Sequence, residues 1–373
     1  CDAIFQTIAG WSILEEMLKT EQTSRIADTT IAQPANFLIQ VGLTALWGSR
    51  GVDPGAIIGH SVGEVTAAYV AGVLTLEESL LVSYHRSRIQ KKAAGVGKML
   101  AVSMSEEQCT NLLKEMKGEV SIAAINSPTA VTLAGDALAL QAIQEHLTQR
   151  GEAGRFLQVE VPYHSPFMEP LKPEVRAVLA RLQPKAPTIP LYSTVTGDAV
   201  TSVLYDAEYW CDNIREPVYF AEGIGSLLRD GHRMFLEVGP HPVLSTSIKE
   251  CSRHRSIESQ TVASLRRQKA ERRTFQLALA QLYVAGCTID WRRQYSADVR
   301  YVKLPTYPWQ REVYWSENSE SRADRIGEHH ANAGKRGLQP TSDPRQRAAR
   351  AGGQALVLAV VGLEPAPHGG QRV

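Results

Sequence analysis

The chain has 373 residues, 43% of them hydrophobic, which is ample for a sizeable core in one large domain or two. Its 40 basic and 39 acidic residues leave a formal net charge of +1, which gives no electrostatic case for binding nucleic acid or an anionic membrane surface. The apolar runs fall short of the roughly 20 residues that span a bilayer, and the amino end lacks a signal-peptide pattern. We therefore expect a cytoplasmic protein.

The first predicted elements surround a serine. Residues 33–48 have helical spacing and precede an apolar, strand-like run at 57–58, which ends in Gly-x-Ser-x-Gly at 59–63 and is followed by a second helical pattern. A serine on so sharp a strand-to-helix turn points its hydroxyl outward. Ser61 is therefore a candidate nucleophile. The amide of Val62, at the start of the helix, is a candidate donor to an oxyanion.

Arg86 lies on the next segment with helical spacing. An arginine can hold a carboxylate through two parallel hydrogen bonds, which a lysine does less well. The alternative is a solvated arginine on a helix face.

The middle of the chain predicts an inserted subdomain. Strands and helices are expected in the order βαββαβ, which is the ferredoxin-like pattern. The predicted ranges are a strand at 98–104, a helix at 106–117, strands at 120–126 and 130–133, a helix at 137–149 and a strand at 155–161.

A histidine follows the last of these strands. The run at 155–161 leads to His164, in a turn bounded by Pro162 and Pro166. A lone histidine is more often structural than catalytic, but a serine hydroxyl is a poor nucleophile until an imidazole accepts its proton. We predict that His164 is the base for Ser61, in a cleft where the insert rejoins the larger layer.

The remainder returns to α/β character, with strands expected at 189–193 and 233–238 and a helix at 274–285. The predicted fold class is therefore α/β, a hydrolase-like core around a parallel sheet with a ferredoxin-like insert. Five scattered cysteines without ligand spacing fit reduced thiols, so no metal site is expected. Residues 319–373 are rich in Arg, Gly and Ala, which indicates a mostly disordered tail.

Taken together, these residues resemble the malonyl-type acyltransferase family, specifically the acyltransferase domain of a type I polyketide synthase. The resemblance runs through residues 1–318 and implies an acyltransferase domain over 1–290 and a linker over 291–318 that packs back toward a ketosynthase. The matching motifs are Gly59–Glu64, Arg86, Gly97–Met99 with Ala101–Val102, Asn126–Pro128, Leu133–Gly135, Tyr163–Pro166, Leu191–Gly197, Tyr209–Trp210, Asn213–Val218 and Glu237–Pro242.

The resemblance implies a two-step acyl transfer. Ser61 would attack the thioester of an acyl-coenzyme A, and the phosphopantetheine thiol of an acyl carrier protein would then remove the acyl group. His164 would serve as base in both steps, and Arg86 would pair with the free carboxylate of a malonyl-type group. No cofactor is bound in such a domain. Its partners are the carrier protein, the ketosynthase and the other domains of the synthase.

Further residues are expected at the substrate. In related domains the residue after the serine and those before the histidine shape the pocket, and here they are Val62 and Tyr163. A bulky ring at Tyr163 leaves little room for an α-methyl group, which favours malonyl over methylmalonyl. His60 and Asn126 are expected to line the site.

Two other functions stay open at this stage. A serine esterase or thioesterase would need an acidic partner, and Ser61, Asp212 and either His232 or His241 satisfy its order along the chain. The second alternative is that the chain is an inactive docking fragment of a synthase. Family members usually begin with a strand and a Gly-Gln-Gly loop whose glutamine completes the oxyanion hole, and this chain starts after that position. Our hypothesis is a fragment of a longer synthase, with residues outside it supplying that strand.

Overall fold

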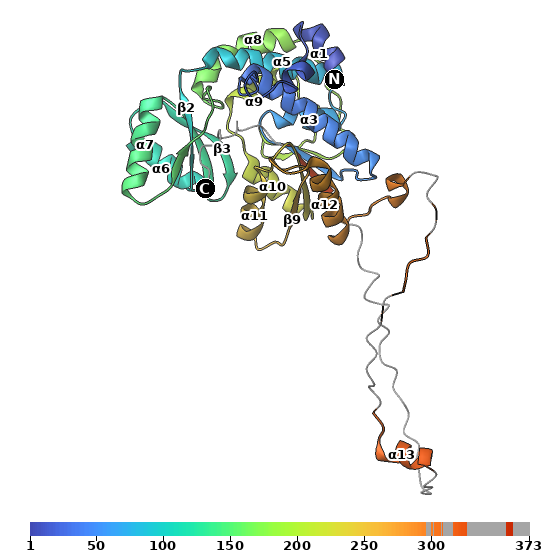
Figure 1. Cartoon of the computed structure of the whole chain (residues 1–373). Coiled ribbons are helices and arrows are strands. Elements are labelled where there is room, and N and C mark those ends of the chain that lie inside the picture. The colour runs from blue at the N-terminus through green and yellow to red at the C-terminus, as the bar shows by residue number, and fades with distance from the viewer. Residues whose placement is uncertain (296–299, 301, 307, 309–315, 327–355, 361–373) are drawn as a thin grey trace. The chain divides into compact units, whose positions relative to one another are not determined.

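The computed structural model describes residues 1–295, 300, 302–306, 308, 316–326 and 356–360 (Figure 1). The chain divides into two compact units, one formed by residues 1–293 with 353–373 and the other by residues 294–352. Of the second unit, the regular structure described is helix α13 (Ser319–Ile326), where Arg325 pairs with Glu317 at 2.9 Å.

The first unit contains two sheets and the helices that cover them. Its helices are α1 (Asp2–Ala9), α2 (Ile13–Met17), α3 (Thr29–Ser49), α4 (Gly63–Val70), α5 (Leu76–Gln90), α6 (Glu106–Glu115), α7 (Ala137–Gln149), α8 (Lys172–Leu179), α9 (Ala207–Arg215), α10 (Phe220–Arg229), α11 (Ser245–His254) and α12 (Glu271–Val284). Its strands are β1 (Ala56–Gly59), β2 (Lys98–Val102), β3 (Val120–Ser127), β4 (Ala130–Gly135), β5 (Gly154–Phe156), β6 (Leu191–Ser193), β7 (Asp198–Ala199), β8 (Met234–Val238), β9 (Gln260–Ala263) and β10 (Leu356–Val360).

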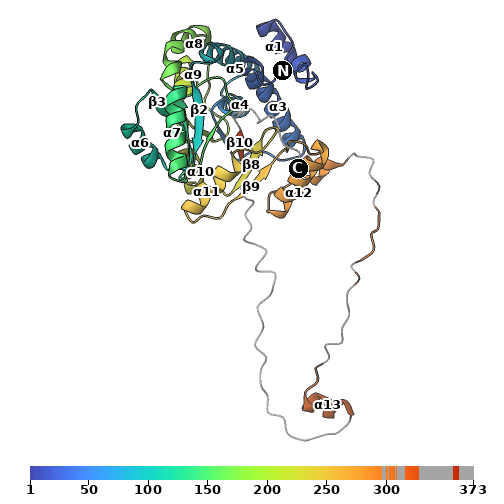
Figure 2. The ribbon, with the colours of Figure 1, turned by 60° about the vertical axis from the view of Figure 1, so that its left-hand side comes forward.

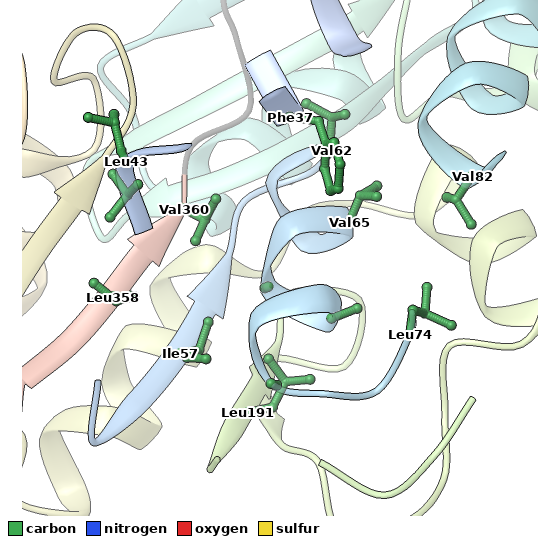
Figure 3. Close-up of a cluster of buried hydrophobic side chains, with 14 of the residues drawn as sticks. Phe37, Leu43, Ile57, Val62, Val65, Leu74, Val82, Leu191, Leu358 and Val360 are labelled. Atoms are coloured by element: carbon green, nitrogen blue, oxygen red, sulfur yellow. The ribbon is translucent and has the colours of Figure 1, made fainter. Parts of the chain in front are cut away.

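The larger sheet has the order β7-β6-β1-β10-β8-β9, and all of its pairs are parallel except β6 with β7. Every residue of β1, β8 and β10 is buried, as expected for strands covered on both faces. Alternate residues pack against α3, α4 and α12 on one side and against α10 and α11 on the other. Figure 3 shows the first of these layers, where Ile57 and Leu358 lie below Val65. The predicted α/β core is confirmed.

The centre of this sheet differs from the sequence-based expectation. Residues 356–360 fall in the tail predicted to be disordered, yet they form β10, which pairs with β1 and β8 in parallel register. They also fill a central place in the sheet without any strand from outside the chain. The physical reason is local: five consecutive apolar residues, each at most 5% exposed, interrupt an otherwise polar tail. Residues 319–326 of the predicted tail form helix α13, and residues 327–355 and 361–373 lie outside the described residues.

The smaller sheet has the order β3-β4-β2-β5 with antiparallel pairs, which is the predicted ferredoxin-like arrangement with α6 and α7 as its helices (Figure 2). The strand predicted at 98–104 ends at Val102 and the helix predicted at 106–117 ends at Glu115, but the last strand differs most. The run at 155–161 was expected to be a strand throughout, but β5 ends at Phe156, and residues 157–163 continue without strand structure. Only three residues pair with β2, so the chain can leave the sheet and turn toward the larger layer.

Two predicted helices are displaced by a few residues. The pattern at 33–48 belongs to α3, which begins earlier because the Asp28 side chain accepts a hydrogen bond from the Thr30 amide at 2.8 Å. The pattern at 274–285 is α12. Of the predicted linker, residues 291–294 form a short 3₁₀ helix, and most of residues 307–315 lie outside the described part. No helix in the described ranges is long and apolar enough to cross a membrane.

Candidate active site

Ser61 lies on the turn between β1 and α4. Its backbone φ is 52°, in the left-handed region that non-glycine residues rarely adopt, and Val62 is the N-cap residue of the helix. Such a conformation costs on the order of 1 kcal/mol or more, so it persists only where the surrounding structure enforces it. The turn therefore presents the serine hydroxyl beyond the carboxyl end of β1, as the Gly-x-Ser-x-Gly pattern predicts.

His164 meets that hydroxyl from the loop after β5. Its Nε2 lies 2.7 Å from Ser61 Oγ, and its Nδ1 lies 2.9 Å from the carbonyl oxygen of Glu216. Since a carbonyl only accepts, Nδ1 carries the proton and Nε2 is free to accept the one on Ser61. The imidazole is 3% exposed. Burial, together with the nearby charge of Arg86, lowers the pKa of His164 to about 3, so the ring is neutral at pH 7.

Arg86 reaches the same hydroxyl from α5, so the alternative interpretation, a solvated arginine on a helix face, is wrong. Its side chain is 2% exposed, and Nη2 lies 3.1 Å from Ser61 Oγ. Gln33 and Gln90 accept from Nη1 at 2.6 and 3.0 Å, and Asn213 accepts from Nε at 3.0 Å. Burial lowers the pKa of Arg86 to about 10, which leaves it charged at pH 7.

These contacts change how Arg86 can bind a carboxylate. A guanidinium has five N–H donors, and four of them are taken by Asn213, Gln33, Gln90 and Ser61. Within the described residues, the second N–H of Nη2 has no acceptor. An incoming carboxylate can therefore take this N–H at once, whereas the two parallel bonds expected from the sequence require one amide to move away.

The two other residues expected to line the site contact each other. His60 Nε2 lies 2.8 Å from Asn126 Oδ1, and the imidazole packs edge-on against Phe220. Asn126 also donates to Thr132 in the smaller sheet at 3.3 Å. Burial lowers the pKa of His60. This pair joins the end of β1 to β3, so it ties the two sheets together beside Ser61.

Val62 and Tyr163 occupy different settings. The Val62 side chain is 7% exposed and lies beside Phe37 in the core, as Figure 3 shows. The Tyr163 hydroxyl lies 2.6 Å from Thr29 Oγ1, which fixes the ring against the start of α3. Burial raises the pKa of Tyr163, so its phenol stays protonated at neutral pH.

The acidic partner required by the esterase interpretation is not beside His164. Asp212 pairs with Lys172 at 3.2 Å, and His241 Nδ1 accepts from the Arg267 amide. His232 packs edge-on against Tyr192. The group that orients the base is the backbone carbonyl of Glu216, as the family resemblance implied.

Sequence reasoning missed several polar residues around Arg86. Gln33 and Gln90 lie on helices α3 and α5, and both are almost fully buried. Glu64, whose place in the first turn of a helix is as compatible with a helix-dipole or capping role as with a functional one, is fully buried and contacts Thr194, Tyr209 and Asn213. The sequence offers one signal for such residues, which is a polar residue within an apolar stripe of a helix. This signal indicates burial but does not reveal which residue the polar group contacts.

Neither metal ligation nor disulfide bonding is seen in the part of the chain that the structure describes. No group of three or more His, Cys, Asp or Glu residues there could hold a metal ion. All five cysteines are free thiols, and four of them are buried.

Comparison with known proteins places this geometry in a family context. The model of the "Acyl transferase domain" family matches residues 1–289. Over 321 residues the chain is 36% identical to the polyketide synthase GfsB of Streptomyces halstedii, and the match covers 86% of this chain but 6% of that protein. Two crystal structures of acyltransferase domains from the salinomycin polyketide synthase are also similar. The domain from module 8 has a TM-score of 0.76 at 31% identity, covering 79% of this chain and 69% of that one. The domain from the second module has a TM-score of 0.74 at 35% identity, covering 82% and 73%.

Proposed function

We propose that this chain, which belongs to the acyl transferase domain family, moves an extender acyl unit from coenzyme A to the phosphopantetheine thiol of an acyl carrier protein during polyketide synthesis in the cytoplasm. The observation that carries the proposal is the convergence on one hydroxyl: Ser61 Oγ lies 2.7 Å from His164 Nε2 and 3.1 Å from Arg86 Nη2. A base and a cation at one serine suit the attack of an alcohol on an acyl donor that carries a negative group.

In the first step, the Ser61 oxygen attacks the thioester carbonyl carbon while its proton passes to His164 Nε2. The resulting oxyanion is favoured by the start of α4, where the Val62 amide is the proposed donor. Collapse of this intermediate breaks the carbon–sulfur bond. The departing thiolate takes the proton from His164, and the acyl group remains as an ester on Ser61.

In the second step, the carrier-protein thiol gives its proton to His164, and its sulfur attacks the ester carbonyl. The carbon–oxygen bond to Ser61 then breaks, and the serine recovers the proton from His164. His164 then returns to its neutral form. Burial favours that form, and the Glu216 carbonyl keeps the proton on Nδ1. The carrier protein and the other domains of the synthase are therefore the proposed partners.

Malonyl is the proposed extender unit. Its free carboxylate suits the N–H of Arg86 Nη2 that has no acceptor in the described structure. The fixed Tyr163 ring supports the smaller donor, because a ring held by Thr29 cannot easily turn away from an α-methyl group. Replacing Tyr163 with serine should lower the preference for malonyl over methylmalonyl, and an unchanged ratio would remove the steric argument.

Intact-mass analysis after mixing with malonyl-, methylmalonyl- and acetyl-CoA tests the proposal. We expect a covalent adduct on Ser61 from the dicarboxylic donors and none on S61A. Transfer of that adduct to a phosphopantetheinylated carrier protein checks the second step. Rapid release of acetate from simple esters would instead favour a hydrolase, and no adduct from any donor would refute the transferase.

A further inference from the structure

We propose that Glu64 and Asn213 are positioning residues that hold the guanidinium of Arg86 with Nη2 directed at Ser61, and thereby make the site select donors with a free carboxylate. The inference rests on the proposed function, because it names what keeps the carboxylate-binding group in place. Neither residue is required to touch the acyl group.

Asn213 joins the two charged groups. Its Oδ1 accepts from Arg86 Nε at 3.0 Å, and its Nδ2 donates to Glu64 Oε2 at 3.1 Å. A carboxylate only accepts and a guanidinium only donates, so one orientation of the amide satisfies both neighbours. Turning the amide by half a rotation would set an N–H against Arg86 and an oxygen against Glu64. The carboxylate, with the Ser61 carbonyl oxygen that accepts from Nδ2 at 3.4 Å, therefore keeps Oδ1 facing Arg86.

Glu64 is itself held rigidly. It is fully buried on α4, three residues after Ser61, and it accepts from the Thr194 amide and hydroxyl at 2.5 and 2.8 Å. The Tyr209 hydroxyl also donates to it. Burial raises the pKa of Glu64, and these donors together with Asn213 oppose that shift. Its contacts tie the turn that carries Ser61 to the end of β6 and to α9.

The arrangement also balances buried charge. Arg86 and Glu64 are both shielded from water, and an unpaired charge in such a place is strongly unfavourable. Asn213 transmits the interaction between them through two hydrogen bonds instead of a direct ion pair. Because Glu64 is occupied by its own donors, it compensates the charge of Arg86 without blocking Nη2. A carboxylate in direct contact would compete with the substrate for that group.

Removing either positioning residue should affect carboxylate binding more than serine reactivity. Without Asn213, Nε loses its acceptor, and the buried amides that still hold the guanidinium, Gln33 and Gln90, both bind Nη1. With E64Q, Nδ2 of Asn213 loses its carboxylate acceptor and keeps only the longer contact with the Ser61 carbonyl oxygen at 3.4 Å, so the amide is held less firmly. The base, by contrast, depends on Glu216 and remains in place.

The test compares two reactions of Ser61 in the same chain. Acylation by malonyl-CoA needs the carboxylate site, whereas labelling by a neutral fluorophosphonate needs only the nucleophile and base. The variants are E64Q, N213A and the double variant. The matched control is E237Q, which alters another buried carboxylate. Glu237 accepts from the Val243, Leu244 and Ser245 amides and is not among the hydrogen-bond acceptors of Arg86 in the described part of the chain.

We expect E64Q and N213A each to slow malonyl acylation on the order of 10-fold while fluorophosphonate labelling stays within about twofold. Because Glu64 acts through Asn213, the double variant should be no slower than N213A. E237Q should lower the melting temperature without changing the ratio of the two rates. If the wild-type chain forms no malonyl adduct, the proposed function fails first, and the comparison among variants is not reached.

Three results would overturn the inference once the wild-type adduct is established. The first is an unchanged malonyl rate in both single variants. The second is an equal loss of both reactions in a folded variant, since that describes a purely structural role. The third is additive losses in the double variant. If E64Q alone is too unstable to assay, N213A compared with E237Q decides the question.

Discussion

Substituting Gly59 with alanine should disable the turn that presents Ser61. A Cβ atom at this position would lie 2.5 Å from both Cα and N of Glu64 and 2.7 Å from the carbonyl carbon of Gly63. All three are backbone atoms, so no side-chain rotation relieves the overlap. Carbon atoms in contact normally lie about 3.5 to 4.0 Å apart, so the start of α4 must move by about 1 Å.

That displacement gives the expected magnitude. A misplacement of about 1 Å in a reacting group costs on the order of 100-fold in rate, and overpacking a core costs about 1 to 3 kcal/mol in the free energy of unfolding. Ser61 moves with the turn, so its hydrogen bond to His164 Nε2 lengthens from 2.7 Å. We expect G59A to lose about 100-fold in the rate of malonyl acylation and about 1 to 3 kcal/mol of stability.

Gly223 offers a matched control on α10. A Cβ there would lie 2.7 Å from Cδ1 of Ile58, which is the end of a flexible side chain, and its next neighbours are 3.9 Å away. Alanine also favours a helix over glycine by about 1 kcal/mol, which offsets the adjustment of Ile58. G223A should therefore match the wild type in urea midpoint and keep its acylation rate within about threefold. The reasoning is refuted if G59A and G223A behave alike in acylation rate and in urea unfolding.

Three further predictions concern the base, the central strand and the tyrosine. Because burial lowers the pKa of His164 to about 3, the base of the free enzyme stays neutral as pH falls through 6.5, so kcat/KM for acylation should be flat from about pH 5.5 to 7.5; an inflection near the ordinary histidine pKa of about 6.5 would contradict this. Replacing Leu358, 2% exposed at the centre of β10, with alanine should cost about 2 to 5 kcal/mol in urea unfolding. The same change at Leu304, which is 75% exposed, should stay within about 0.5 kcal/mol, and equal midpoints for the two variants would argue against the central placement of β10. Replacing Thr29 with valine removes the partner of the Tyr163 hydroxyl at nearly constant volume, so the malonyl-to-methylmalonyl ratio should fall about fivefold for a lost hydrogen bond of about 1 kcal/mol; an unchanged ratio in competition assays would show that the ring needs no anchor.

Local patterns predicted the elements that carry the reacting groups. The apolar run before Ser61 and the glycines beside it specify a strand, a turn and a helix within a few residues. The βαββαβ order of the insert could also be predicted, because its strands and helices differ in hydrophobic periodicity and are separated by turn residues. The length of β5 could not be predicted, since the ends of a strand depend on which neighbouring strand is available for pairing.

Short-range periodicity and side-chain chemistry were enough to predict the serine turn, the two-sheet α/β architecture and the kinds of residue needed for acyl transfer. The surroundings of Arg86 could not be predicted in this way, since its acceptors Gln33 and Asn213 lie 53 and 127 positions away along the chain. The same holds for the five apolar residues of the polar tail that form β10 between β1 and β8. Hydrogen-bond partners and strand neighbours are set by packing across the fold, and a buried amide or an apolar run carries no local mark of the partner it will meet.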